Sequence, residues 1–179
     1  MSSATQSGRT SPSGDAIVRA DLVMTALFAV SASCAAAWFT TTWQWVGAIV
    51  AMSLFAVGVF VFLWSYWSAV QRSRTAEIAV TQLYLLMGDA VPAPVRRTMN
   101  LVLVGQFLIA TATTFVRPDG PDGSPGSSLA LGFLVPMLGF GLNGLWAVRH
   151  GNFAARADLG ADRSLHVSEG EIGQNADHG

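Results

Sequence analysis

The sequence predicts an all-α integral membrane protein with four transmembrane helices in an up-down-up-down bundle, because it contains three long runs without formal charge. Residues 22–71 hold no charged side chain, whereas charged residues make up about 25% of ordinary soluble proteins. As one helix this run would be roughly 75 Å long, far more than a hydrocarbon core of about 30 Å. It must therefore fold back as two spans, and the uncharged runs 98–116 and 123–148 supply one span each.

The first two spans are predicted over about 22–42 and 46–69, and the short link between them makes them antiparallel neighbours. Span one carries small residues at every fourth position, which allows another helix to approach closely; these are Ala29, Ser33 and Ala37. The same small residues would permit cleavage of span one as a secretory signal. The mixed charges before it favour a retained span.

The segment between spans two and three is predicted to form one interfacial amphipathic helix over about 75–88. Its apolar stretch is too short to cross a membrane and suits the interface or the base of the bundle. Pro92 and Pro94 prevent its continuation. Span three then follows over about 98–116, and span four over about 128–148.

The arginines predict the orientation. With four spans and the N-terminus inside, nine of the ten arginines fall on the cytoplasmic side and Arg117 alone falls outside. We therefore expect a multi-pass protein of the plasma (cytoplasmic) membrane, with both termini cytoplasmic. Residues 1–14 are expected to be a disordered tail, 15–149 the membrane domain, and 150–179 a mostly disordered second tail.

Four arginines flank the predicted interfacial helix: Arg72, Arg74, Arg96 and Arg97. Topology alone explains this bias. The sharper interpretation is a contact surface for anionic lipid or for a partner, because each basic group near an anionic leaflet contributes about 1 kcal/mol.

Span four is unusually rich in glycine and contains a proline. Gly139, Gly141 and Gly144 match the dinucleotide-binding spacing, but that mechanism needs a strand before the glycines, and here they lie in an apolar helix. Pro136 removes one backbone hydrogen bond and should bend the helix. We favour a tight helix–helix seam over a gating element.

Gln106 and Asn143 are the two amides deep inside the predicted spans. A lone amide in hydrocarbon is costly unless it is hydrogen-bonded, so each should face the bundle or another subunit, or line a polar path. Asp21 lies just before span one, and we expect it to pair with Arg96 or Arg97 at the interface. No ionisable residue then lies within a span, which weighs against ion-coupled transport.

Composition excludes several function classes. The chain has 179 residues, of which 51% are hydrophobic and 12% charged, so little remains for a soluble catalytic domain. One cysteine and no clustered histidines predict no metal site and no cofactor. The general appearance is similar to small four-span membrane proteins of GC-rich bacteria, without a motif that names a family.

The leading hypothesis for function is therefore a non-enzymatic accessory or scaffold subunit that acts through helix–helix contacts. Its partners would be membrane lipids, other membrane subunits or a second copy, with no nucleic acid. The alternative is a small transporter or channel subunit with a polar path near Gln106 and Asn143.

Overall fold

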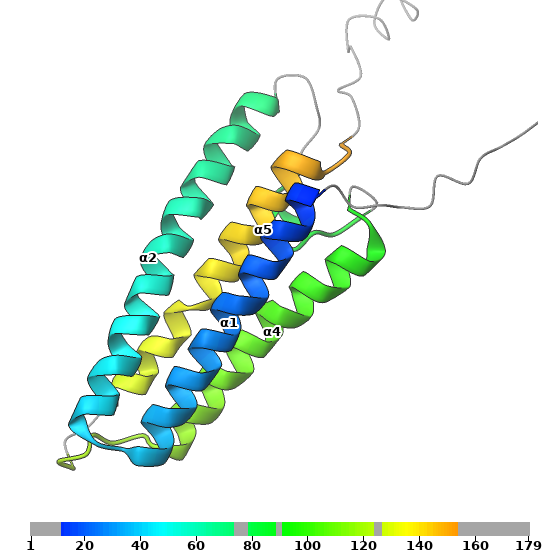
Figure 1. Ribbon diagram of the computed structural model, residues 1–179. Helices are drawn as coiled ribbons and strands as arrows, with labels where there is room; N and C mark the ends of the chain where they lie inside the picture. Colours follow the sequence, from blue (N-terminus) through cyan, green and yellow to red (C-terminus); the bar gives the residue numbers. More distant parts are fainter. Residues whose placement is uncertain (1–11, 74–78, 89–90, 124–126, 154–179) are drawn as a thin grey trace, which may run out of the picture.

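The computed structural model describes residues 12–73, 79–88, 91–123 and 127–153, which form a helical bundle (Figure 1). Four helical segments in this part of the chain are long and apolar enough to cross a membrane. They are α1 (Pro12–Trp38), α2 (Thr41–Arg72), α4 (Ala93–Val116), and the pair formed by the 3-10 helix η1 (Ser128–Leu134) and α5 (Pro136–His150). The prediction of an all-helical chain with four apolar spans is confirmed.

Each span runs antiparallel to the next, so the bundle has two ends (Figure 1). At the loop end, α1 joins α2 and α4 leads into η1; at the terminal end, α1 begins and α5 finishes. Only Phe39 and Thr40 separate α1 from α2, and Phe39 takes a positive φ of 28°. The helices differ from the predicted spans in extent: α1 starts at Pro12, inside the tail expected to be disordered, and α2 starts within the predicted link.

The last span is the centre of the bundle. In its most apolar 18-residue window 61% of the residues are buried, against 33% or less in the other three spans. Helix α5 packs most extensively on α2 and also contacts α1, α3 and α4. Helices α2 and α4 therefore lie on opposite sides of α5, and α1 packs on both of them.

Glycines allow α5 and α2 to bring their backbones into direct contact. A Cβ atom at Gly58 of α2 would lie 2.5 Å from the backbone nitrogen of Leu138, and one at Gly141 would lie 2.7 Å from the carbonyl oxygen of Gly58. One turn further along α5, a Cβ at Gly144 would lie 2.6 Å from the hydroxyl oxygen of Ser65. At Gly58 and Gly141 no larger residue fits without separating the helices, because the neighbouring atoms are backbone, whereas at Gly144 the side chains of Ser65 and Tyr84 would have to move.

The proline of the last span lies where the helix type changes. Helix η1 ends at Leu134, and Pro136 occupies the first turn of α5, where its missing N–H has no intrahelical partner to lose. The side chain of Ser127 accepts a hydrogen bond from the backbone N–H of Leu129 and so caps η1. The predicted irregularity is therefore a 3-10 segment followed by an α-helix.

The helix predicted over 75–88 is much shorter in the structure. Helix α3 covers only Val80–Tyr84, Leu86 has a positive φ of 52°, and residues 74–78 lie outside the described part. Tyr84 stacks on Phe62 of α2 with ring centroids 4.3 Å apart, and Leu86 is fully buried. The described part of this segment, residues 79–88, therefore packs against the bundle.

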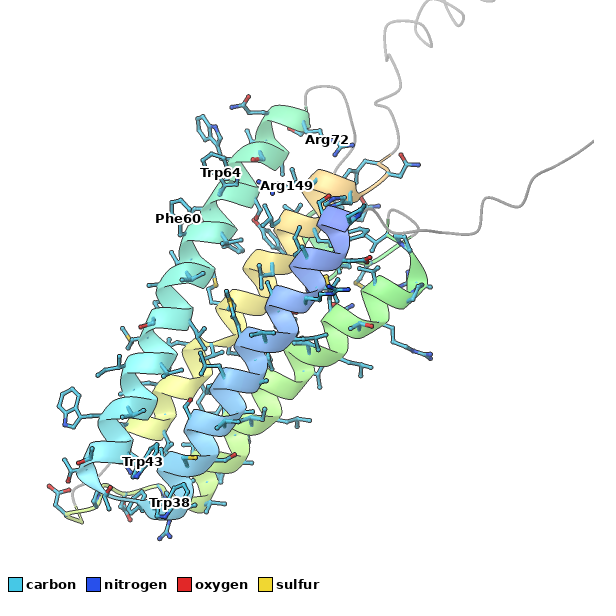
Figure 2. All side chains as sticks on the ribbon, in the orientation of Figure 1. Trp38, Trp43, Phe60, Trp64, Arg72 and Arg149 are labelled. Carbon is cyan, nitrogen blue, oxygen red and sulfur yellow. The ribbon has the colours of Figure 1, made fainter. Side chains whose placement is uncertain are left out.

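Aromatic side chains mark both ends of the bundle. Trp38 and Trp43 stack at the loop end with ring centroids 5.3 Å apart, whereas Trp64 lies toward the terminal end (Figure 2). Trp38 and Trp64 are exposed on the outer surface. Such rings are typical of the two membrane–water interfaces of a spanning bundle.

Candidate functional site

Three polar side chains meet inside the bundle between α1 and α4, and we call them the Asp21 cluster: Asp21, Thr25 and Gln106. Asp21 and Thr25 are four residues apart and therefore share one face of α1. Gln106 Nε2 donates a hydrogen bond to Thr25 Oγ1 at 2.6 Å and a longer one to Asp21 Oδ1 at 3.5 Å. Asp21 and Gln106 are both completely buried.

The Asp21 cluster has more hydrogen-bond acceptors than donors. Asp21 Oδ2 and Gln106 Oε1 have no hydrogen-bond partner, although both are buried. Helix α5 closes directly over the amide, since a Cβ at Gly139 would lie 2.9 Å from Gln106 Oε1. An unpaired buried acceptor costs about 1–3 kcal/mol, so a fold that keeps two of them needs an explanation.

The expected pairing of Asp21 with Arg96 or Arg97 is wrong. Arg96 donates a hydrogen bond to the carbonyl oxygen of Gly88 at 2.6 Å, and the side chain of Arg97 is exposed. Asp21 is part of α1, about 25 Å along the helix axis from Trp38 at the other end. Helix α1 begins ten residues before the predicted start of the first span, so this carboxyl lies inside the bundle and not at the interface.

Asn143 and Gln106 do not pair with each other, and Asn143 belongs to a second polar group. Asn143 Nδ2 donates to the carbonyl oxygen of Tyr84 at 2.9 Å and to Asn100 Oδ1 at 3.4 Å, while Asn100 Nδ2 donates to the carbonyl oxygen of Leu85 at 2.8 Å. These carbonyls lie at the free C-terminal end of α3. The two asparagines thus fasten α3 to the bundle.

The environment of this second group is also dry. Burial raises the pKa of the Tyr84 hydroxyl above its ordinary value, so this phenol is neutral at physiological pH. Asn143 Oδ1 is buried without a hydrogen-bond partner. Asn143 lies one turn of α5 beyond Gly139, toward the terminal end, so the second group continues from the Asp21 cluster in that direction.

An apolar layer separates the Asp21 cluster from the loop end. It consists of Phe28, about one turn beyond Thr25 on α1, Ala110, about one turn beyond Gln106 on α4, and Gly132 of η1, which packs against both. Phe28 and Ala110 are buried, and a Cβ at Gly132 would lie 3.2 Å from the Phe28 ring. The aromatic ring is therefore packed against a position that only glycine can occupy without displacing it.

Beyond this layer, a cavity of about 300 Å³ opens near the loop end. Its walls include Gln44 of α2 and Ser128 of η1, and Gln44 Oε1 accepts a hydrogen bond from the backbone N–H of Ser128 at 3.3 Å. Asp122 also lines it. The cavity is thus polar on one side, and it lies on the opposite side of the Phe28 layer from the Asp21 cluster.

The four arginines differ in what they contact. Arg72 donates hydrogen bonds to the carbonyl oxygens of Val148 and Gly151, the latter at 3.2 Å, and so binds the C-terminal end of α5 (Figure 2). Arg96 binds Gly88, Arg97 is exposed, and Arg74 lies outside the described residues. Arg72 is therefore engaged within the chain, whereas a lipid or partner contact of Arg97 stays a prediction.

Comparisons with known proteins do not assign a family to this chain. The chain matches no protein-family model, and searches of curated proteins and of solved structures give no match either. Among the residues described, no group of three or more His, Cys, Asp or Glu side chains could hold a metal ion. The site has to be interpreted from its own geometry.

Proposed function

We propose that this chain is a non-enzymatic, multi-pass membrane transport component whose path follows the facing sides of α1, α4 and α5. The observation that carries the proposal is the fully buried Asp21 carboxyl beside Gln106. An ionisable side chain within a span is expensive and is the usual mark of a pathway or a relay. The sequence alone favours an accessory or scaffold subunit over a transporter, because it predicts no ionisable group inside a span.

The arrangement of polar and apolar layers supports a closed state of such a path. Polar side chains extend from Asn143 at the terminal end to the Asp21 cluster, and the Phe28 layer then lies between the cluster and the loop end. A path of this form opens when the Phe28 layer and Gly139 separate from their neighbours. Pro136 lies between Gly132 of that layer and Gly139.

The arginine distribution supports a plasma-membrane location with both ends of the chain cytoplasmic, so that the terminal end of the bundle faces the cytoplasm. A reporter fused after residue 122 should then be active outside the cell, and one fused after residue 153 inside. The reverse pattern would contradict this orientation. We also propose that Arg97 contacts anionic lipid headgroups at the inner surface.

Reconstitution into liposomes tests the transport role. Wild-type vesicles should pass ions or small polar solutes faster than protein-free vesicles, and Gln106→Leu should abolish the difference because it removes the amide from the path. Gly105→Ala is the matched control, since a Cβ at Gly105 meets no atom within 4 Å. Equal flux in wild-type and Gln106→Leu vesicles would remove Gln106 from any path.

A second candidate function, an accessory or scaffold subunit, is favoured by the outer face of α1. Ser33 and Ala37 are exposed and Ala29 is half-buried, whereas the inward face uses Ala32 and Ala35. The small-residue stripe therefore faces away from the bundle, where another helix or a second copy could pack on it. Native mass spectrometry from lipid discs tests this: Ser33→Leu should release the partner, and a monomeric wild type in every lipid would exclude it.

A further inference from the structure

We propose that the Asp21 cluster is a proton-binding site, with the proton held on the Asp21 carboxyl and shared with Gln106. This inference rests on the proposed transport role and names its ligand. The structure places one carboxyl, one amide and one hydroxyl together in the interior between α1 and α4, with two buried acceptor oxygens left over.

The count of donors and acceptors identifies the missing group. Gln106 Nε2 already donates to Thr25 and to Asp21 Oδ1, and a carboxylate supplies only acceptors. The Thr25 hydroxyl is a further donor, but it reaches neither Asp21 Oδ2 nor Gln106 Oε1. Asp21 Oδ2 and Gln106 Oε1 are therefore two acceptors facing no donor. One proton on the carboxyl converts Asp21 into a donor. Gln106 Oε1, which is otherwise unpaired, can then accept a hydrogen bond from it.

Charge leads to the same conclusion. A carboxylate without a cationic partner is strongly disfavoured in an apolar interior, and neutralisation by a proton is the usual solution. The side chains that share hydrogen bonds with Asp21 in its cluster are Gln106 on α4 and, through Gln106, Thr25 on its own helix, and neither carries a charge. The described basic groups toward the terminal end are engaged elsewhere or exposed: Arg72 binds the end of α5, Arg96 binds Gly88, His150 Nε2 lies 2.9 Å from Ser13 Oγ, and Arg19, Arg97 and Arg149 are exposed.

A metal cation fits the cluster less well than a proton. Hard cations take about six or more oxygen ligands, whereas the cluster offers side-chain oxygens from only Asp21, Thr25 and Gln106. Helix α5 also leaves little room above the amide, because even a Cβ at Gly139 would lie 2.9 Å from Gln106 Oε1. A proton needs no coordination shell and no extra volume.

Loading and release follow a simple balance. Loading adds one proton from water to the carboxylate and neutralises it; release returns that proton to water and leaves the carboxylate, which then requires hydration. Because the Asp21 carboxyl is completely buried, water can reach it only if the helices around it separate. Proton exchange is thus coupled to a separation of these helices.

Infrared difference spectroscopy of the full chain in lipid discs tests the inference without any flux measurement. At neutral pH the wild type should show the carbonyl stretch of a protonated carboxyl, and Asp21→Asn should remove it. Asp119→Asn is the matched control, because Asp119 is an exposed loop carboxyl, and it should retain the band. Absence of the band in the wild type, or its persistence in Asp21→Asn, would overturn the proposal.

A second variant tests the shared proton. Gln106→Met keeps the carboxyl and removes the amide acceptor, so the band should move to higher frequency as the hydrogen bond is lost. An unchanged band would mean that Gln106 does not share the proton. If added sodium chloride, compared with choline chloride, abolishes the band, the ligand is a metal cation and the proton assignment fails.

The two proposals fail separately. A protonated Asp21 in a protein that passes no ion or solute leaves the binding site intact and refutes the transport role. Flux that needs Gln106 in a protein without the protonated band keeps the transport role and refutes the proton site.

Discussion

The contact between α2 and α5 gives the sharpest stability prediction, because the same glycine-to-alanine substitution should have opposite effects at two positions of this chain. In Gly58→Ala the new methyl carbon would lie 2.5 Å from the backbone nitrogen of Leu138 and 2.7 Å from its Cα. Ordinary contact distances are about 3.5–4.0 Å, so the two helices must separate by about 1 Å. Because the neighbouring atoms are backbone, no side-chain rotation can relieve the clash. Overpacking of this kind costs about 1–3 kcal/mol.

Gly105→Ala adds the same methyl group where it meets no atom within 4 Å. Since alanine is the better helix former, this variant should be neutral or more stable by up to about 1 kcal/mol. The assay is reversible unfolding in mixed micelles, followed by circular dichroism, with both variants measured beside the wild type. If Gly58→Ala proves as stable as Gly105→Ala, the direct backbone contact between α2 and α5 does not exist as described.

Three further predictions concern other contacts. Arg72→Met should lower the free energy of unfolding by about 1–2 kcal/mol, because it removes charged hydrogen bonds to the end of α5; Arg97→Met, at an exposed site, should change it little, and equal losses would contradict the capping role. Asn143→Leu should accelerate amide hydrogen exchange across 79–88, since the carbonyl of Tyr84 loses its donor; unchanged protection, measured by mass spectrometry, would contradict it. Phe28→Ala should raise the passive ion conductance of planar bilayers several-fold by opening the apolar layer, and an unchanged conductance would show that Phe28 does not close a path.

The sequence was sufficient for the number of spans, because charge-free runs and the length of a span are set by the thickness of the bilayer. It was insufficient for the ends of the helices. Helix α1 extends ten residues before the first uncharged run, since backbone hydrogen bonding continues through charged residues such as Arg19 and Asp21. Because the predicted span begins later than α1 does, the sequence predicts Asp21 at the membrane interface, whereas the structure buries it inside the bundle.

Only part of the candidate site could be predicted from the sequence. Gln106 was identified because an amide in an apolar run is conspicuous, but its partners are on α1, 81 and 85 residues away in the chain. The spacing of Asp21 and Thr25 by four residues was the available signal, and it has meaning only once α1 is known to face α4. The role of Asn143 as a donor to Tyr84 could not be predicted either, because it depends on where a five-residue helix stops.

The central position of α5 has a consequence for how the bundle is assembled. Among the described spans it is the last to leave the ribosome, and yet it is the one on which α2 and α4 both pack. Until it inserts, Gln106 lacks the cover of Gly139, the backbone of α2 at Gly58 faces lipid, and α3 has no asparagine from α5 to hold it. The first three spans therefore lack their shared packing partner until the glycine-rich span inserts, and that insertion completes the interior of the bundle.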